Sequence, residues 1–234
     1  MKYSFITFSN EKYEKKQQEL INYVKFMRNK GSSLFTDIIG YNTNWLKGTD
    51  FYKSNKLILD MERGAGFWLW KPFIILETLK NVNDEDAVFY IDCGDTFYKD
   101  LISYTSPILE KENCLLLGGS YVQKDWTKAD CFYYMNCTGD EYKNALQLEA
   151  GVQLWKKTSS SIKILEEQIK WCSDYRILTD SQNESGMAND PGFKDHRHDQ
   201  SVLTNLMVKY SLPVDTFRAP SPYSRMRDYV KCNI

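Results

Sequence analysis

Two aspartates, Asp92 and Asp95, follow a run of five apolar residues, Ala87–Ile91, that is typical of a buried strand. A carboxylate is unfavourable inside an apolar core unless it meets water, a metal ion or a hydrogen-bond donor. Ligands of open α/β sheets bind beyond the carboxyl ends of strands, and hard divalent cations prefer oxygen ligands. The pair therefore indicates a site for a divalent cation and an anion. Two structural roles remain open, with Asp95 as the N-cap of a helix from Thr96 and Asp92 in an Asx turn.

A second block with chemical potential, RGAGFWLWKP, occupies residues 63–72, ahead of that strand. Gly64 and Gly66 permit a positive φ or a close approach of the backbone. Arg63 and Lys71 supply fixed positive charge, and two roles are open to them, as contacts of an anionic ligand or as solvated neighbours. The two tryptophans of the block are expected to fill the core.

The elements that must position these residues follow from the hydrophobic pattern. Further strands are predicted at residues 3–8, 34–39, 57–59, 114–120 and 151–155, and helices at 11–30, 72–80, 159–172 and 198–210. A strand, helix, strand opening favours an α/β sheet with right-handed crossovers. The polar, aperiodic residues 179–197 are expected to form a lid or binding loop, or to be disordered. Without repeats or a linker, residues 1–234 are predicted to form one domain.

Composition limits the class of partner. The formal net charge is −1, with 30 basic and 31 acidic residues, so we expect no general nucleic-acid binding. No apolar run approaches the roughly 18 residues of a transmembrane segment, and the amino-terminal residues do not resemble a signal peptide. A cytoplasmic location is therefore expected, in the host cytoplasm if the source is viral.

Four blocks, RGAGFWLWKP, AVFYIDCGD, LEAGVQLWKK (residues 148–157) and HRHDQSVLTNL (196–206), resemble the GT-A glycosyltransferases that use nucleotide sugars. They are similar in particular to small bacterial and viral enzymes in which G-x-G-[YF]-W-x-W-K-P precedes Y-[IL]-D-x-G. The resemblance implies a single GT-A-like, Rossmann-like α/β domain whose mostly parallel central sheet is flanked by helices. It also implies transfer of a sugar from a UDP- or GDP-sugar to a hydroxyl of a glycan or glycoconjugate.

The resemblance implies a metal site for Mn²⁺ or Mg²⁺. Its predicted ligands are Asp92, Asp95 and His198. The usual DxD motif would have its second aspartate where Gly94 stands, so Asp95 either reaches the metal from a different turn or is replaced by water. His198 has two further roles open, as a donor to the diphosphate and as a solvated side chain.

The resemblance further divides the site into a donor side and an acceptor side. The predicted donor-binding residues are Thr7, Arg63, Lys71 and Asp92. Glu149 and Asp199 are the predicted catalytic residues, as bases that deprotonate the acceptor hydroxyl. Glu149 can also be an ordinary surface acid, and Asp199 is expected to N-cap the last helix in either case.

Three arginines near the end of the chain, Arg218, Arg225 and Arg227, either fold over the diphosphate or belong to a solvated segment. Two functions of other classes also fit paired aspartates. One is a metal-dependent phosphohydrolase or nucleotidyltransferase, and the other is a non-catalytic module that binds a sugar or nucleotide.

Overall fold

The computed structural model describes residues 1–29, 35–97, 101–215 and 230–231. A six-stranded sheet with the order β2-β1-β3-β6-β5-β7 forms its centre. The strands are β1 (Tyr3–Ser9), β2 (Phe35–Asn42), β3 (Ala87–Ile91), β5 (Cys114–Val122), β6 (Leu146–Lys156) and β7 (Val214–Asp215). β4 (Thr96–Phe97) and β8 (Val230–Lys231) pair separately. Within the six-stranded sheet, β6 runs antiparallel to β3 and β5 and the other pairings are parallel, which confirms the mostly parallel sheet.

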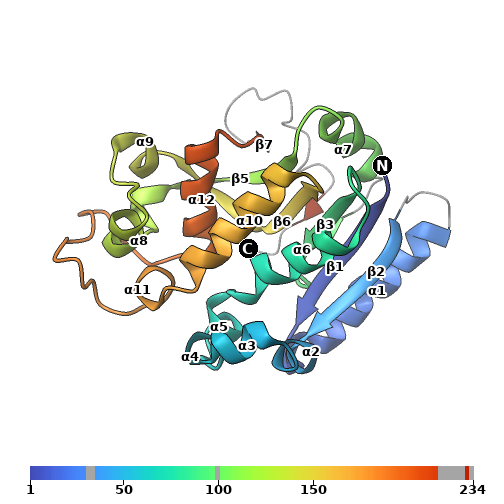
Figure 1. Cartoon of the computed structure of the whole chain (residues 1–234), viewed down its shortest axis with the longest axis horizontal. Helices are drawn as coiled ribbons and strands as arrows, with labels where there is room; N and C mark the ends of the chain where they lie inside the picture. Colours follow the sequence, from blue (N-terminus) through green and yellow to red (C-terminus); the bar gives the residue numbers. More distant parts are fainter. Residues whose placement is uncertain (30–34, 98–100, 216–229, 232–234) are drawn as a thin grey trace.

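Helices cover both faces of the sheet (Figure 1). They are α1 (Glu14–Asn29), α2 (Thr43–Lys47), α3 (Asp50–Ser54), α4 (Lys56–Leu59), α5 (Gly64–Phe67), α6 (Trp70–Asn81), α7 (Leu101–Leu109), α8 (Ala129–Tyr134), α9 (Asp140–Lys143), α10 (Ser159–Cys172), α11 (Tyr175–Leu178) and α12 (His198–Tyr210), with 3-10 turns η1 (Glu11–Tyr13) and η2 (Gln123–Asp125). In the part of the chain that is described, no helix has the length and apolar character needed to cross a membrane.

Two apolar cores lie on opposite faces of the sheet because successive strand residues point to alternate sides. Val88 and Tyr90 of β3 join the core under α6, α10 and α12, whereas Phe89 and Ile91 join the core under α1 and α7. The predicted strand Ala87–Ile91 is confirmed, and all five of its residues are buried. Its end is therefore fixed on both faces, which gives the two aspartates that follow a rigid support.

Two sequence-based predictions are corrected by the structure. Residues 57–59 belong to helix α4 and not to a strand, because three apolar residues are too few to distinguish the two periods. Strand β6 begins at Leu146, before the predicted residue 151, so Glu149 lies inside the strand. Helices α7 and α8 were not expected from the pattern.

Candidate functional site

A tight turn after β3 holds Asp92 and Asp95. The Asp95 N–H donates to the Asp92 carbonyl oxygen at 2.9 Å, and the Asp92 N–H donates to the Gly151 carbonyl oxygen of β6 at 2.8 Å. Strand β4 begins at Thr96, so the role of Asp95 as the N-cap of a helix from that residue is wrong. The turn spans four residues, 92–95, and points both aspartates toward β6.

The two carboxylates converge on Gly151. A Cβ added there would lie 3.0 Å from Asp95 Oδ2 and 3.1 Å from Asp92 Oδ2, so these two oxygens are within about 6 Å of each other. The extra residue, Gly94, therefore does not separate the carboxylates. A pair of carboxylate oxygens beside a space left open by a glycine fits a hard cation such as Mg²⁺ or Mn²⁺.

The structure does not place His198 with this pair. Among the described residues there is no cluster of three or more His, Cys, Asp and Glu side chains suited to a metal. His198 is buried, with Nδ1 2.8 Å from the Leu178 carbonyl oxygen and its ring stacked at 5.5 Å on Trp68. Burial lowers the pKa of His198 and keeps the ring neutral. The solvated alternative is wrong, because the ring is buried.

Lys71 lies behind Asp92 and is only 2 % exposed. Its Nζ is 3.2 Å from Asp92 Oδ1 and 3.5 Å from Asp199 Oδ2, and the Tyr90 hydroxyl also donates to Asp92 Oδ1. Burial acts to lower the pKa of Lys71, but the charges of Asp199 and Asp92 outweigh it and leave that pKa raised. Lys71 thus orients and neutralises Asp92, and it does not line the cavity where the sequence placed it.

Asp199 occupies the first turn of α12, where Arg197 is the N-cap residue, so the predicted capping role of Asp199 is wrong. Burial raises the pKa of Asp199 to about 6, although Lys71 opposes the shift. Lys71 is shared by the carboxylates of Asp92 and Asp199, and its charge does not fully offset the burial of the Asp199 carboxylate. The carboxylate of Asp199 is not part of the cavity lining.

The RGAGFWLWKP block at residues 63–72 contains a left-handed turn. All five residues from Gly64 to Trp68 have positive φ, at 59°, 52°, 95°, 51° and 58°. A Cβ at Gly64 would lie 2.4 Å from the Trp68 ring, and one at Gly66 would lie 2.6 Å from Leu59 Cα. The indole N–H of Trp70 donates to the Gly64 carbonyl oxygen at 3.0 Å. Such conformations are unfavourable for residues other than glycine and occur mainly at functional sites.

Arg63, at the start of this turn, forms ion pairs with two carboxylates of the loop at residues 179–197. Its guanidinium donates to Asp180 Oδ2 at 2.8 Å and to Asp195 Oδ2 at 2.7 Å. Hydrogen bonding to Asp195 raises the pKa of Arg63, against the effect of burial. Like Lys71, Arg63 is not part of the cavity lining.

The loop at residues 179–197 is fixed to α8 and its flank. The buried carboxylate of Asp130 accepts hydrogen bonds from the backbone N–H groups of Glu184 and Ser185 at 2.8 and 3.1 Å. The ammonium group of Lys128 donates to the Ser181 carbonyl oxygen at 2.7 Å. These contacts favour a static loop over the lid that the sequence suggests.

A cavity of about 540 Å³ opens at the carboxyl ends of β1 and β3, between the aspartate turn and the left-handed turn. This volume is within the range of ligand pockets. Its lining consists of Phe8, Ser9, Asn10, Lys12, Tyr13, Lys16, Glu62, Gly64, Ala65, Trp68, Trp70, Asp92, Cys93, Gly94 and Asp95. Trp70 is buried and stacks on Phe8 at 3.9 Å, as expected for a core residue, whereas Trp68 is partly exposed to the cavity.

Sequence reasoning missed the cavity residues that follow β1, above all Lys12, Tyr13 and Lys16. A signal was present, because these polar and aromatic residues stand directly after a buried strand. The spacing of four between the lysines also places them on one side of a helix.

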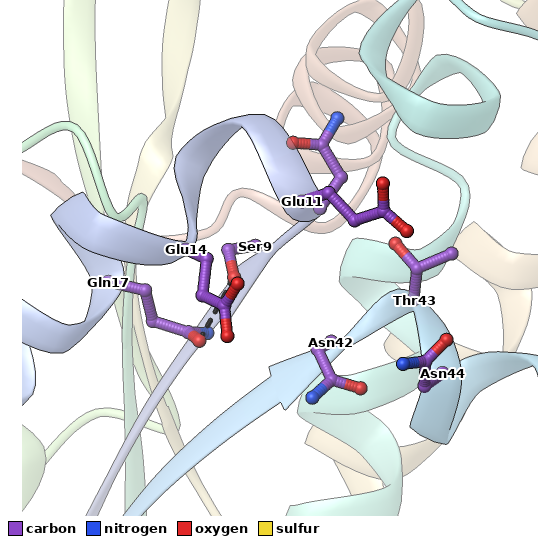
Figure 2. Close-up of a pocket in the computed structure, with 8 residues that line it drawn as sticks. Ser9, Glu11, Glu14, Gln17, Asn42, Thr43 and Asn44 are labelled. Atoms are coloured by element: carbon purple, nitrogen blue, oxygen red, sulfur yellow. Dashed lines mark hydrogen bonds between the residues drawn. The ribbon is translucent and has the colours of Figure 1, made fainter.

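A smaller pocket of about 80 Å³ adjoins the cavity through Ser9 and Asn10 (Figure 2). Its eight lining residues are all polar, and none of them carries a positive charge. Glu11 and Glu14 supply carboxylates, and the others supply amides or hydroxyls. The lining consists of Ser9, Asn10, Glu11, Glu14, Gln17, Asn42, Thr43 and Asn44. The pocket lies where β1 and β2 end. Its two carboxylates disfavour a phosphate there.

Thr7 and Glu149 lie apart from the cavity lining. Thr7 is fully buried within β1, so its side chain does not reach the donor position predicted for it. Glu149 is half-buried in β6, two residues before Gly151 and beside Gly119 of β5. Arg218, Arg225 and Arg227 lie outside the described residues.

Comparison with known proteins agrees with this architecture. No protein-family model matches the chain, and no curated protein matches it. The structure is similar to mouse xyloside xylosyltransferase 1, with a TM-score of 0.50 and 9 % identity over 100 % of this chain and 95 % of that chain. A glycosyltransferase involved in glycosylation of the major capsid of PBCV-1 has a TM-score of 0.47 and 11 % identity, over 100 % of this chain and 94 % of that chain. The galactosyltransferase LgtC has a TM-score of 0.45 and 12 % identity, over 90 % of this chain and 72 % of that chain. The chain has the α/β fold of the GT-A glycosyltransferases.

Proposed function

We propose that this protein is a glycosyltransferase that moves a sugar from a UDP- or GDP-sugar to a hydroxyl of a glycan or glycoconjugate. The observation that supports it most is the convergence of Asp92 and Asp95 on Gly151, at the mouth of a cavity large enough for a nucleotide. The fold adds support, because it is similar to that of a xylosyltransferase, with a TM-score of 0.50.

Asp92 and Asp95 would hold Mn²⁺ or Mg²⁺. When bound, the cation would offset the negative charge that develops on the departing diphosphate. Lys71 and the Tyr90 hydroxyl hold Oδ1 of Asp92, which leaves Oδ2 directed at the Gly151 position. The chain thus fixes one ligand oxygen in advance, and a fixed ligand does not have to be ordered when the donor binds.

The acceptor side is proposed at Glu149. It is the predicted base that lies on β6, the strand whose Gly151 faces the aspartate pair. Asp199 is a weaker candidate, because its carboxylate is buried against Lys71 behind Asp92. We propose that Glu149 deprotonates or orients the acceptor hydroxyl, and that Asp199 acts through Lys71.

The experiment incubates the protein with UDP- and GDP-sugars, Mn²⁺ and a panel of glycan acceptors, and separates the products by chromatography. A transferase releases nucleoside diphosphate together with a glycosylated acceptor. Release of inorganic phosphate would favour the phosphohydrolase, and nucleotide binding without turnover would favour the binding module.

Two variants make the assay specific. Asp92→Asn should abolish transfer, since it removes a charge at the proposed metal site. Asp84→Asn is the matched control, because the side chain of Asp84 is 90 % exposed and is not part of the cavity lining, and it should leave transfer unchanged.

A further inference from the structure

Lys12 and Lys16 line the same cavity as the aspartate turn. Both side chains are exposed at its rim, and each Nζ lies 5.7 Å from the ring of Tyr13, which holds the two ammonium groups on one side of the helix. The lining of the same cavity includes Asp92 and Asp95. The lysines therefore face the same space as Asp92 and Asp95.

The cations predicted from the sequence are already engaged elsewhere. Arg63 is bonded to Asp180 and Asp195, and Lys71 is buried between Asp92 and Asp199. Within the described residues, Lys12 and Lys16 are the cationic side chains that line the cavity, and no salt bridge is found for either of them.

The sign of the net charge of the cavity lining depends on Lys12 and Lys16. The cavity carries three carboxylates, Glu62, Asp92 and Asp95, which a divalent cation offsets only in part. The buried Lys71 does not change this balance, because its charge is matched by that of Asp199. With that cation and the two lysines the lining has a net charge of about +1, and without the lysines it would be about −1. A diphosphate is attracted in the first case and repelled in the second.

The neighbouring small pocket does not compete for the phosphates. Its eight lining residues include Glu11 and Glu14 and no lysine or arginine, as Figure 2 shows. We infer that Lys12 and Lys16 bind the diphosphate of the nucleotide donor. This inference rests on the proposed function and adds to it the residues that recognise the donor charge.

The test is calorimetric titration of wild type and of Lys12→Gln, Lys16→Gln and the double variant with UDP and with GDP, each with Mn²⁺. A charged hydrogen bond to phosphate is worth roughly ten- to a hundredfold in affinity. Each single variant should therefore weaken binding about tenfold, and the double variant about a hundredfold. Lys15→Gln is the matched control, because Lys15 is on the same helix, is exposed and does not line the cavity, so it should bind like wild type.

A second titration with uridine and guanosine separates charge recognition from damage to the cavity. Binding of the uncharged nucleosides should be the same in wild type and in the lysine variants, and Lys16→Arg should keep most of the affinity for the diphosphate. Wild-type affinity of the double variant for UDP and GDP would overturn the inference alone. An equal loss of nucleoside binding would overturn it as well. If wild type binds neither diphosphate, the proposed function fails and the inference fails with it.

Discussion

Replacing Lys71 by methionine tests whether one buried cation holds two carboxylates together. Methionine is similar in length and apolar, so Lys71→Met removes the charge and leaves little cavity. In the protein, Nζ of Lys71 lies 3.2 Å from Asp92 Oδ1 and 3.5 Å from Asp199 Oδ2, with the lysine side chain 3 % exposed. Without it, two like charges share a site from which water is largely excluded.

The magnitude follows from the burial of each partner. Removing one partner of a buried ion pair costs about 3–5 kcal/mol, because the other charge is left without compensation. The side chain of Asp92 is 35 % exposed and can be hydrated, whereas that of Asp199 is 4 % exposed. Most of the loss should therefore come from Asp199, and the double variant Lys71→Met with Asp199→Asn should recover about 2 kcal/mol or more of it.

The assay is chemical denaturation at pH 7.5, followed by circular dichroism, for wild type, both single variants and the double variant. Lys53→Met is the control, since Lys53 is 69 % exposed in its pair with Asp50, and exposed pairs contribute at most about 1 kcal/mol. A loss below about 1 kcal/mol in Lys71→Met, or additive losses in the double variant, would refute the shared-cation arrangement.

Three further outcomes follow from the site. Gly151→Ala should lower Mn²⁺-dependent transfer at least tenfold while the far-ultraviolet dichroism is unchanged, because its Cβ would lie 3.0 and 3.1 Å from the two carboxylate oxygens. The pKa of Asp199 is raised to about 6 from 3.8, so the native state binds its proton more tightly, and stability present below pH 4 is lost as the pH rises through 6. Denaturation at pH 4 and 7 should therefore show wild type losing about 2 kcal/mol relative to Asp199→Asn. Gly64→Ala should lower the free energy of unfolding by at least about 1–2 kcal/mol, since φ is 59° and the methyl group meets the Trp68 ring, and equal stability would contradict the left-handed turn.

Much of the fold was accessible from periodicity. The strand Ala87–Ile91 was predicted with its true bounds, because a run of five apolar residues between polar ones is typical of a buried strand. The antiparallel course of β6 was not predictable, since neither its length nor its composition encodes the direction of its neighbours. The short apolar segment of α4 was assigned to a strand because three residues are too few to distinguish a helix from a strand.

The site shows where sequence reasoning stops. The chemistry of Asp92 and Asp95 could be read from their position after a strand, but their convergence depends on Gly151 of a strand almost sixty residues later. The charges of Arg63 and Lys71 were visible in the sequence, whereas their partners come from distant segments of the chain. Residue type gave the chemistry, and tertiary contacts determined which charges remain available to a ligand.

The most direct test of the central claim is anomalous diffraction, recorded at the manganese absorption edge, from crystals grown with Mn²⁺ and UDP or GDP. The account predicts one strong peak about 2.1 Å from carboxylate oxygens of both Asp92 and Asp95, with the diphosphate of the nucleotide beside it in the cavity. An ordered nucleotide bound away from this turn, or a manganese peak that contacts neither aspartate, would contradict it.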